Sequence, residues 1–215
     1  FLKDDNRYKK FQWVEVDLEK SKKDNRPESF KITNPDDIKV LSAVGTERDW
    51  EHRRRLVLEN SEIHTNFPKL IKAAHANKLS LATFKPSKVI DLVCEDAETD
   101  WPPEKLETVL ANLKQRDLFD EGEAEEFELV KKLPKKFSYR FEDDTGKPRK
   151  LMVEDWELGM LYWNCLRKHD EETAARKVRE KYLKLARETD IHFFVGTTYE
   201  WHLRGTNPYV IIGVF

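Results

Sequence analysis

The strongest charge feature of the sequence is a basic stretch between positions 131 and 150. Eight lysines and arginines lie there against three acids. Phosphates attract such charge, and the alternating Phe137, Tyr139 and Phe141 could stack on bases or sugars. Strand alternation explains the same rings as core residues of a solvated hairpin. We predict nucleic-acid contacts from Lys135, Lys136, Arg140, Arg149 and Lys150.

Two further segments add to this prediction. A helix expected over 47–60 carries consecutive arginines on its outer face, of which we assign Arg53 and Arg54 to nucleic acid. The connection 198–208 between two apolar strands gathers large side chains, and such loops often bind ligands. We assign Trp201, His202 and Arg204 to nucleic acid, with a protein partner through the same loop as an alternative. In a third interpretation Trp201 folds back onto the sheet.

The acids and histidines that catalysis would need are few. Asp155 and Glu157 with His192 and His202 could serve a metal-dependent nuclease, in which carboxylates hold Mg²⁺. Asp155 is also a natural helix N-cap, which explains it without chemistry. Asp91 and Glu95 point to one face of a strand and could bind a cation, but no Glu-x-Lys follows on a neighbouring strand, as a restriction-type nuclease core would require.

No acyl-transfer, phosphate-loop or dinucleotide motif occurs in the sequence. We therefore assign no catalytic residue, no metal ligand and no cofactor. Whether the protein is an enzyme stays open at this point.

The elements that position these residues are clearest in the last third. Alternating residues over 137–153 predict a hairpin with its turn at 144–146. Helices are expected over 155–168 and 171–187, followed by strands 191–197 and 209–215. Trp156 and Trp163, seven residues apart, should lie buried on one helix face.

The first half alternates short strands with helices. Strands are expected over 11–19, 30–32, 79–84 and 88–95, and helices over 35–44, 47–60, 66–77 and 101–114. This pattern predicts an α+β fold with mixed or antiparallel sheets and flanking helices. The acidic segment 117–130 reads as a linker. It would divide an N-terminal lobe, 1–116, from a C-terminal lobe, 131–215, unless both pack as one body.

Composition narrows the setting. The chain has 39 Lys and Arg against 41 Asp and Glu. The net charge of the whole chain therefore gives no reason to expect a polyanionic partner. Cys94 and Cys165 sit in apolar runs, which favours buried thiols and a reducing, cytoplasmic location. Neither a membrane span nor a signal peptide is evident. The missing initiating Met and the apolar last strand suggest that residues are absent at both ends.

The segments VEDWELGMLYWNCLRK and DIHFFVGTTYEWHLRGTNPYVIIGVF resemble an uncharacterised group of prokaryotic proteins. RYKKFQWVEVDLEK and RPESFKI extend the resemblance over most of the chain. The resemblance implies no named activity. In such relatives the hairpin before Asp-Trp-Glu is expected to carry paired Cys and a Gly-His, as in a zinc knuckle. Here Asp143, Asp144, Gly146 and Lys147 stand there, so the hairpin should keep its shape by turn chemistry alone.

Together these features predict a nucleic-acid-binding protein, or a subunit of a larger prokaryotic nucleic-acid-processing or defence system. DNA and RNA are not distinguished. A metal-dependent nuclease or hydrolase is one alternative. A protein-interaction subunit anchored by the Trp201 loop is the other.

Overall fold

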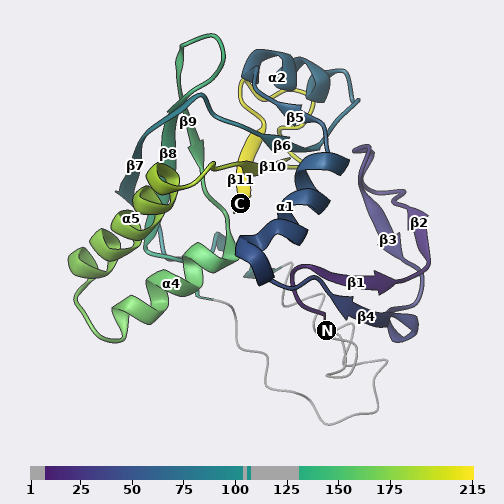
Figure 1. Ribbon diagram of the computed structural model, residues 1–215, viewed down its shortest axis with the longest axis horizontal. Helices are drawn as coiled ribbons and strands as arrows, with labels where there is room; N and C mark the ends of the chain where they lie inside the picture. Colours follow the sequence, from purple (N-terminus) through teal and green to yellow (C-terminus); the bar gives the residue numbers. More distant parts are fainter. Residues whose placement is uncertain (1–7, 104–105, 108–130) are drawn as a thin grey trace.

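The computed structural model describes residues 8–103, 106–107 and 131–215 (Figure 1). The expected linker 117–130 and most of the expected helix 101–114 lie outside these residues. None of the described helices is long and apolar enough to cross a membrane. The architecture is α+β, as predicted, with several small sheets and flanking helices.

Two sheets form the centre of the molecule. The first has the order β11-β10-β6-β5, with β5 Ile63–His64, β6 Leu81–Phe84, β10 Phe193–Thr197 and β11 Tyr209–Val214. The second has the order β7-β8-β9, with β7 Lys88–Asp96, β8 Lys135–Glu142 and β9 Pro148–Met152. Among the named strands of the described residues, β5 and β6 alone pair in parallel, and an isolated parallel bridge joins Val153 to Ile211. Both sheets combine strands from before and after the segment 117–130, so the described parts of both predicted lobes share one core.

Aromatic rings join the two sheets. Phe193 on β10 contacts Tyr139 and Phe141 on β8, with ring centroids 4.9 and 5.5 Å apart. Phe67, at the start of α2, packs edge-on against Phe84 on β6. Burial of large rings is among the strongest contributions to a core of this size. The alternating apolar side chains that predicted strands over 137–153 are therefore side chains of this core.

Three helices close the core, and side-chain caps start each of them. They are α2 Phe67–His75, α4 Trp156–Leu166 and α5 Glu171–Glu188. Asn66, Asp155 and Asp170 each accept a hydrogen bond from a backbone N–H in the first turn of their helix. Such caps satisfy donors that the helix itself leaves open.

The N-terminal segment forms two small sheets and one helix beside this body (Figure 1). Strand β1 Gln12–Glu15 pairs with β4 Lys39–Ala43, and β2 Leu18–Lys20 pairs with β3 Phe30–Ile32. Helix α1, Glu47–Asn60, follows as predicted.

The predicted helix 35–44 was wrong. Asn34 does cap a turn, accepting from the N–H of Asp36, but the turn is a 3₁₀ turn of three residues, Pro35–Asp37. The chain then continues as β4, in which Val40 lies opposite Val14 of β1. Pairing with β1 overrides the helix that the Asn34 cap and the stop at Gly45 predicted.

The predicted burial of the two tryptophans on α4 was wrong for Trp156. Trp156 is 70% exposed, whereas Trp163 is half-buried and packs against the core. The residues that α4 buries are Leu158, Gly159 and Tyr162. At 3.6 residues per turn these three share a face that lies about a quarter turn or more away from Trp156 and Trp163. The spacing of seven placed the tryptophans together but did not say which face points inward.

Candidate nucleic-acid interface

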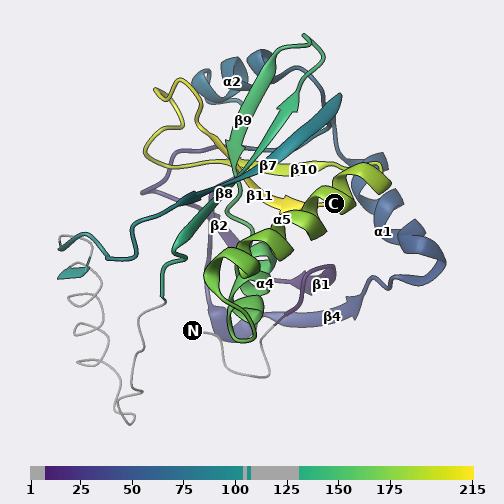
Figure 2. The same cartoon turned by 90° about the vertical axis from the view of Figure 1, so that its left-hand side faces the viewer.

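The sheet β7-β8-β9 has one face in the core and one face outside. Phe137, Tyr139 and Phe141 are at most 1% exposed, so the core interpretation of these rings is confirmed. Successive strand residues point to opposite faces. Lys136, Ser138 and Arg140 therefore point outward. We call this side the outer sheet face; Figure 2 turns the side of the molecule that carries β7 and β8 toward the viewer.

Strand register adds cations and acids to the outer sheet face. Lys88 on β7 lies opposite Glu142, Glu95 on β7 lies opposite Lys136, and Lys150 on β9 lies opposite Arg140. The side chains of Lys88, Lys136 and Arg140 are exposed. Among the described residues, these three cations form no ion pair. Neither Lys88 nor Ser138 was among the predicted contacts, because only the pairing of β7 with β8 brings Lys88 here.

Two predicted contacts lie away from this face. Lys135 forms ion pairs with Asp96 and Glu171, the latter at 3.9 Å, and its hydrogen bond to Asp96 raises its pKa. Arg149 donates to Asp143 at 3.0 Å, and that carboxylate is 1% exposed. Both residues thus hold the hairpin in the structure.

The hairpin turn is held by hydrogen bonds. Asp143 accepts from the backbone N–H and the hydroxyl of Thr145. Asp144 accepts from Thr65 Oγ1 at 3.0 Å and Asn66 Nδ2 at 2.8 Å, which fastens the turn to the start of α2. Gly146 has a φ of +70°, which only glycine adopts without strain. Hydrogen bonds within the turn, the ion pair to Arg149 and the contacts to the start of α2 together account for the shape of the hairpin.

One ion pair crosses the outer sheet face. Lys150 Nζ donates to both carboxylate oxygens of Glu95, at 2.8 and 2.7 Å. This hydrogen bonding lowers the pKa of Glu95. Ser138 lies beside this pair and is 1% exposed, and its Oγ has no hydrogen-bond partner.

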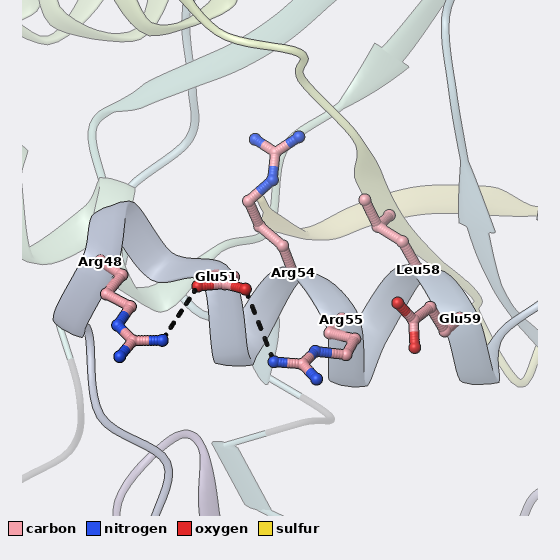
Figure 3. A pocket seen from close by; sticks show the side chains of 6 residues that line it. All are labelled: Arg48, Glu51, Arg54, Arg55, Leu58 and Glu59. Carbon is pink, nitrogen blue, oxygen red and sulfur yellow. Dashed lines mark ion pairs between the residues drawn. The ribbon is translucent and has the colours of Figure 1, made fainter.

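The arginines of α1 divide into two roles. Arg53 donates from Nε to the carbonyl oxygen of Val44 at 2.9 Å, and its guanidinium lies 4.4 Å from the Phe11 ring centroid. It therefore ties the N-terminal segment together. Arg54 is exposed and lines a shallow hollow. Figure 3 shows it turned away from Glu51, whose carboxylate pairs with the arginines on either side, Arg48 and Arg55.

The loop 198–208 separates its large residues into an anchor and a surface. His202 is 1% exposed. Its Nε2 donates to Asn77 Oδ1 at 2.9 Å, which leaves Nδ1 to accept from Thr197 Oγ1 at 2.9 Å. Burial lowers the pKa of His202. Both ring nitrogens of His202 are used within the protein, so the residue positions the loop and has no free polar atom to offer a ligand.

The surface part of the loop carries Tyr199 and Trp201, which are 62% and 48% exposed. The guanidinium of Arg204 lies 5.3 Å from the Trp201 ring centroid. Half of the Trp201 surface stays open, so the interpretation in which it folds back onto the sheet accounts for only part of it.

The carboxylates considered for catalysis each have a separate partner. Asp155 caps α4, Glu157 pairs with Lys10 at 3.1 Å, and Asp91 pairs with Arg179 at 2.6 Å. Burial raises the pKa of Asp155. Within the part of the chain that the structure describes, no three His, Cys, Asp or Glu side chains come together as a metal site would require.

Comparison with known proteins gives two family matches. Residues 1–59 match a domain of unknown function, DUF8758, and residues 62–215 match a second, DUF8757. No curated protein and no solved structure matches the chain. The second match contains both central sheets, the hairpin and the 198–208 loop. The chain belongs to the DUF8757 family, with a DUF8758 domain before it.

Proposed function

We propose that the outer sheet face of this protein binds nucleic acid. The contacts are to the phosphate backbone of the nucleic acid. The observation that carries the proposal is the presence of three exposed cations, Lys88, Lys136 and Arg140, on one face of one sheet. None of them forms an ion pair with another described residue. Cations without partners are the side chains that phosphates can engage without first breaking a contact in the protein.

The arrangement supports contacts to the backbone instead of stacking on bases. Lys136 and Arg140 are four residues apart on β8, which is about 13 Å at the usual rise of a strand. The rings of Phe137, Tyr139 and Phe141 point into the core, so they offer no platform for bases. Binding of this kind depends on charge and is insensitive to base sequence.

The test is fluorescence anisotropy of a labelled 20-base-pair duplex over a range of salt concentrations. The Lys136→Ala/Arg140→Ala variant should bind more weakly. The slope of log affinity against log salt concentration should become shallower by the contribution of about two phosphate contacts. A matched control is Lys22→Ala/Lys23→Ala, which removes the same charge from the exposed turn between β2 and β3. Equal affinity of all three proteins, or equal losses in both variants, would overturn the proposal.

A second candidate function is protein binding through the 198–208 loop. The observation that favours it is the exposure of Tyr199, Trp201 and Leu203 on a loop anchored by buried His202. Tryptophan and tyrosine on rigid supports are typical interface anchors. A photo-crosslinking amino acid at position 201, compared with one at exposed position 156, tests this function. A defined adduct from position 201 alone supports it, and equal or absent adducts contradict it.

A further inference from the structure

The centre of the outer sheet face is crossed diagonally by the Glu95–Lys150 ion pair. Glu95 on β7 lies opposite Lys136, whereas Lys150 on β9 lies opposite Arg140. Ser138 lies midway between Lys136 and Arg140 on β8, the strand between β7 and β9. The register therefore places the pair across the position of Ser138.

Ser138 is not explained by the packing of the fold. Its neighbours on the flanking strands are Val93 and Met152, and its hydroxyl has no hydrogen-bond partner. Burying a hydroxyl without a partner is unfavourable, and an alanine would fit the same position without that cost. The outward direction of residue 138 aims this hydroxyl toward the face that carries the cations.

We infer that Ser138 and Lys150 form a phosphate subsite, flanked by Lys136 and Arg140, in which the Glu95 carboxylate holds the place of a phosphate. The inference rests on the function proposed above and names its central contact. A phosphodiester would take Lys150 from Glu95 and accept a hydrogen bond from the Ser138 hydroxyl. Glu95 would turn into solvent, to which 45% of its side chain is already exposed.

The exchange is favoured by the surroundings of the pair. An exposed ion pair contributes little to stability, so its loss costs the fold little. A phosphodiester brings the same charge as the carboxylate and more acceptor oxygens, and Lys136 and Arg140 stand on either side. Glu95 thus lowers the affinity of the face for any polyanion by competing for Lys150.

The test is a double-mutant cycle on the full chain with the same labelled duplex. Glu95→Gln should tighten binding several-fold more than Glu142→Gln, which removes an equal charge from the same face, where Glu142 has no ion pair with any described residue. Lys150→Ala should weaken binding in both backgrounds, but less in the parent protein, where Lys150 must first leave Glu95, than in the Glu95→Gln background, where it is free. Additive effects in this cycle would contradict the inference.

Ser138→Ala provides an independent readout. It should weaken duplex binding several-fold while leaving the melting temperature unchanged or higher, because the hydroxyl contributes no hydrogen bond to the fold. If duplex binding depends on Lys136 and Arg140 but ignores Ser138 and Glu95, the subsite is wrong and the proposed function stands. If neither the parent protein nor Glu95→Gln binds the duplex, both are wrong.

Discussion

The rings of Tyr139 and Phe193 stack with their centroids 4.9 Å apart and 25° between their planes. Tyr139 belongs to β8 and Phe193 to β10, so this contact joins the two central sheets. The Tyr139 hydroxyl also donates to the carbonyl oxygen of Tyr182 on α5, at 2.9 Å. Burial raises the pKa of Tyr139, so the hydroxyl stays a donor beyond the pH range in which an exposed tyrosine ionises. One pair of rings therefore connects both sheets and a helix.

Phe193→Ala should strongly destabilise the protein. The side chain is fully buried, and its removal leaves a cavity beside Tyr139 and Phe141. We expect the free energy of unfolding in urea to fall by about 3–5 kcal/mol. Trp156→Ala is the comparison, because Trp156 is larger but 70% exposed, and it should cost less than about 1 kcal/mol. Equal losses would mean that Trp156 packs in solution.

Local signals explain which elements could be predicted. Asn66 and Asp155 each begin a helix where the sequence places a cap, and residues 137–141 alternate as a half-buried strand should. These signals act within a few residues of chain. The failure at 35–44 and the inverted exposure of Trp156 have the same cause. In both cases the inward direction is set by a partner distant in sequence, which local periodicity does not contain.

Prediction of the residues on the outer sheet face was limited in the same way. Lys136 and Arg140 could be assigned to it from alternation alone, once the rings were placed in the core. Lys88 and Glu95 could not, because they arrive by antiparallel pairing with a strand some forty residues later in the chain. His202 was assigned to nucleic acid because such loops often bind ligands, and its hydrogen bond to Asn77, which is distant in sequence, holds it in the interior.

Stability should fall at mildly acidic pH because of two buried histidines. Burial lowers the pKa of His192 and of His202 below the ordinary value of 6.5. The unfolded chain therefore binds more protons than the folded chain as pH falls below 6.5. The stability gained by keeping both histidines neutral is fully present above their pKa in the unfolded chain. It is lost as the pH falls toward their pKa values in the folded protein. Urea unfolding between pH 5 and 8 measures this slope.

Histidine variants distinguish the contribution of His192 and His202 to this pH dependence from that of other groups. His192→Asn/His202→Asn should flatten the slope, whereas replacing exposed His169 by Asn should leave it unchanged. A slope that survives the double replacement would assign the effect to other residues.

Asp155 should act as a helix cap. Its carboxylate accepts from the N–H of Glu157 at 2.9 Å, so Asp155→Ala should cost about 1 kcal/mol of unfolding free energy. Asp155→Asn should retain most of the stability, since asparagine caps equally well. Incubation with a labelled oligonucleotide and Mg²⁺ tests the nuclease alternative on the same proteins. Cleavage by the parent chain that both variants lose would favour a metal-dependent role.

The 198–208 loop should tolerate the loss of Trp201 better than a methyl group on Gly205. A Cβ at position 205 would lie 2.8 Å from Trp201 Cβ and 2.9 Å from its carbonyl oxygen. That oxygen accepts from the Gly205 N–H at 2.7 Å, and the Gly205 carbonyl accepts from His75 Nε2 at 2.9 Å. Gly205→Ala must therefore move backbone that other contacts hold, at about 1–3 kcal/mol.

Trp201→Ala removes a ring that is half in solvent and should cost about 1 kcal/mol or less. Thermal melting of both variants gives the order directly. If Trp201→Ala proves the more damaging, the ring is part of the packing of the loop. Its exposure then says little about a partner, and the second candidate function loses its support. If Gly205→Ala is the more damaging, the loop is a rigid support, and Trp201 is free to serve at its surface.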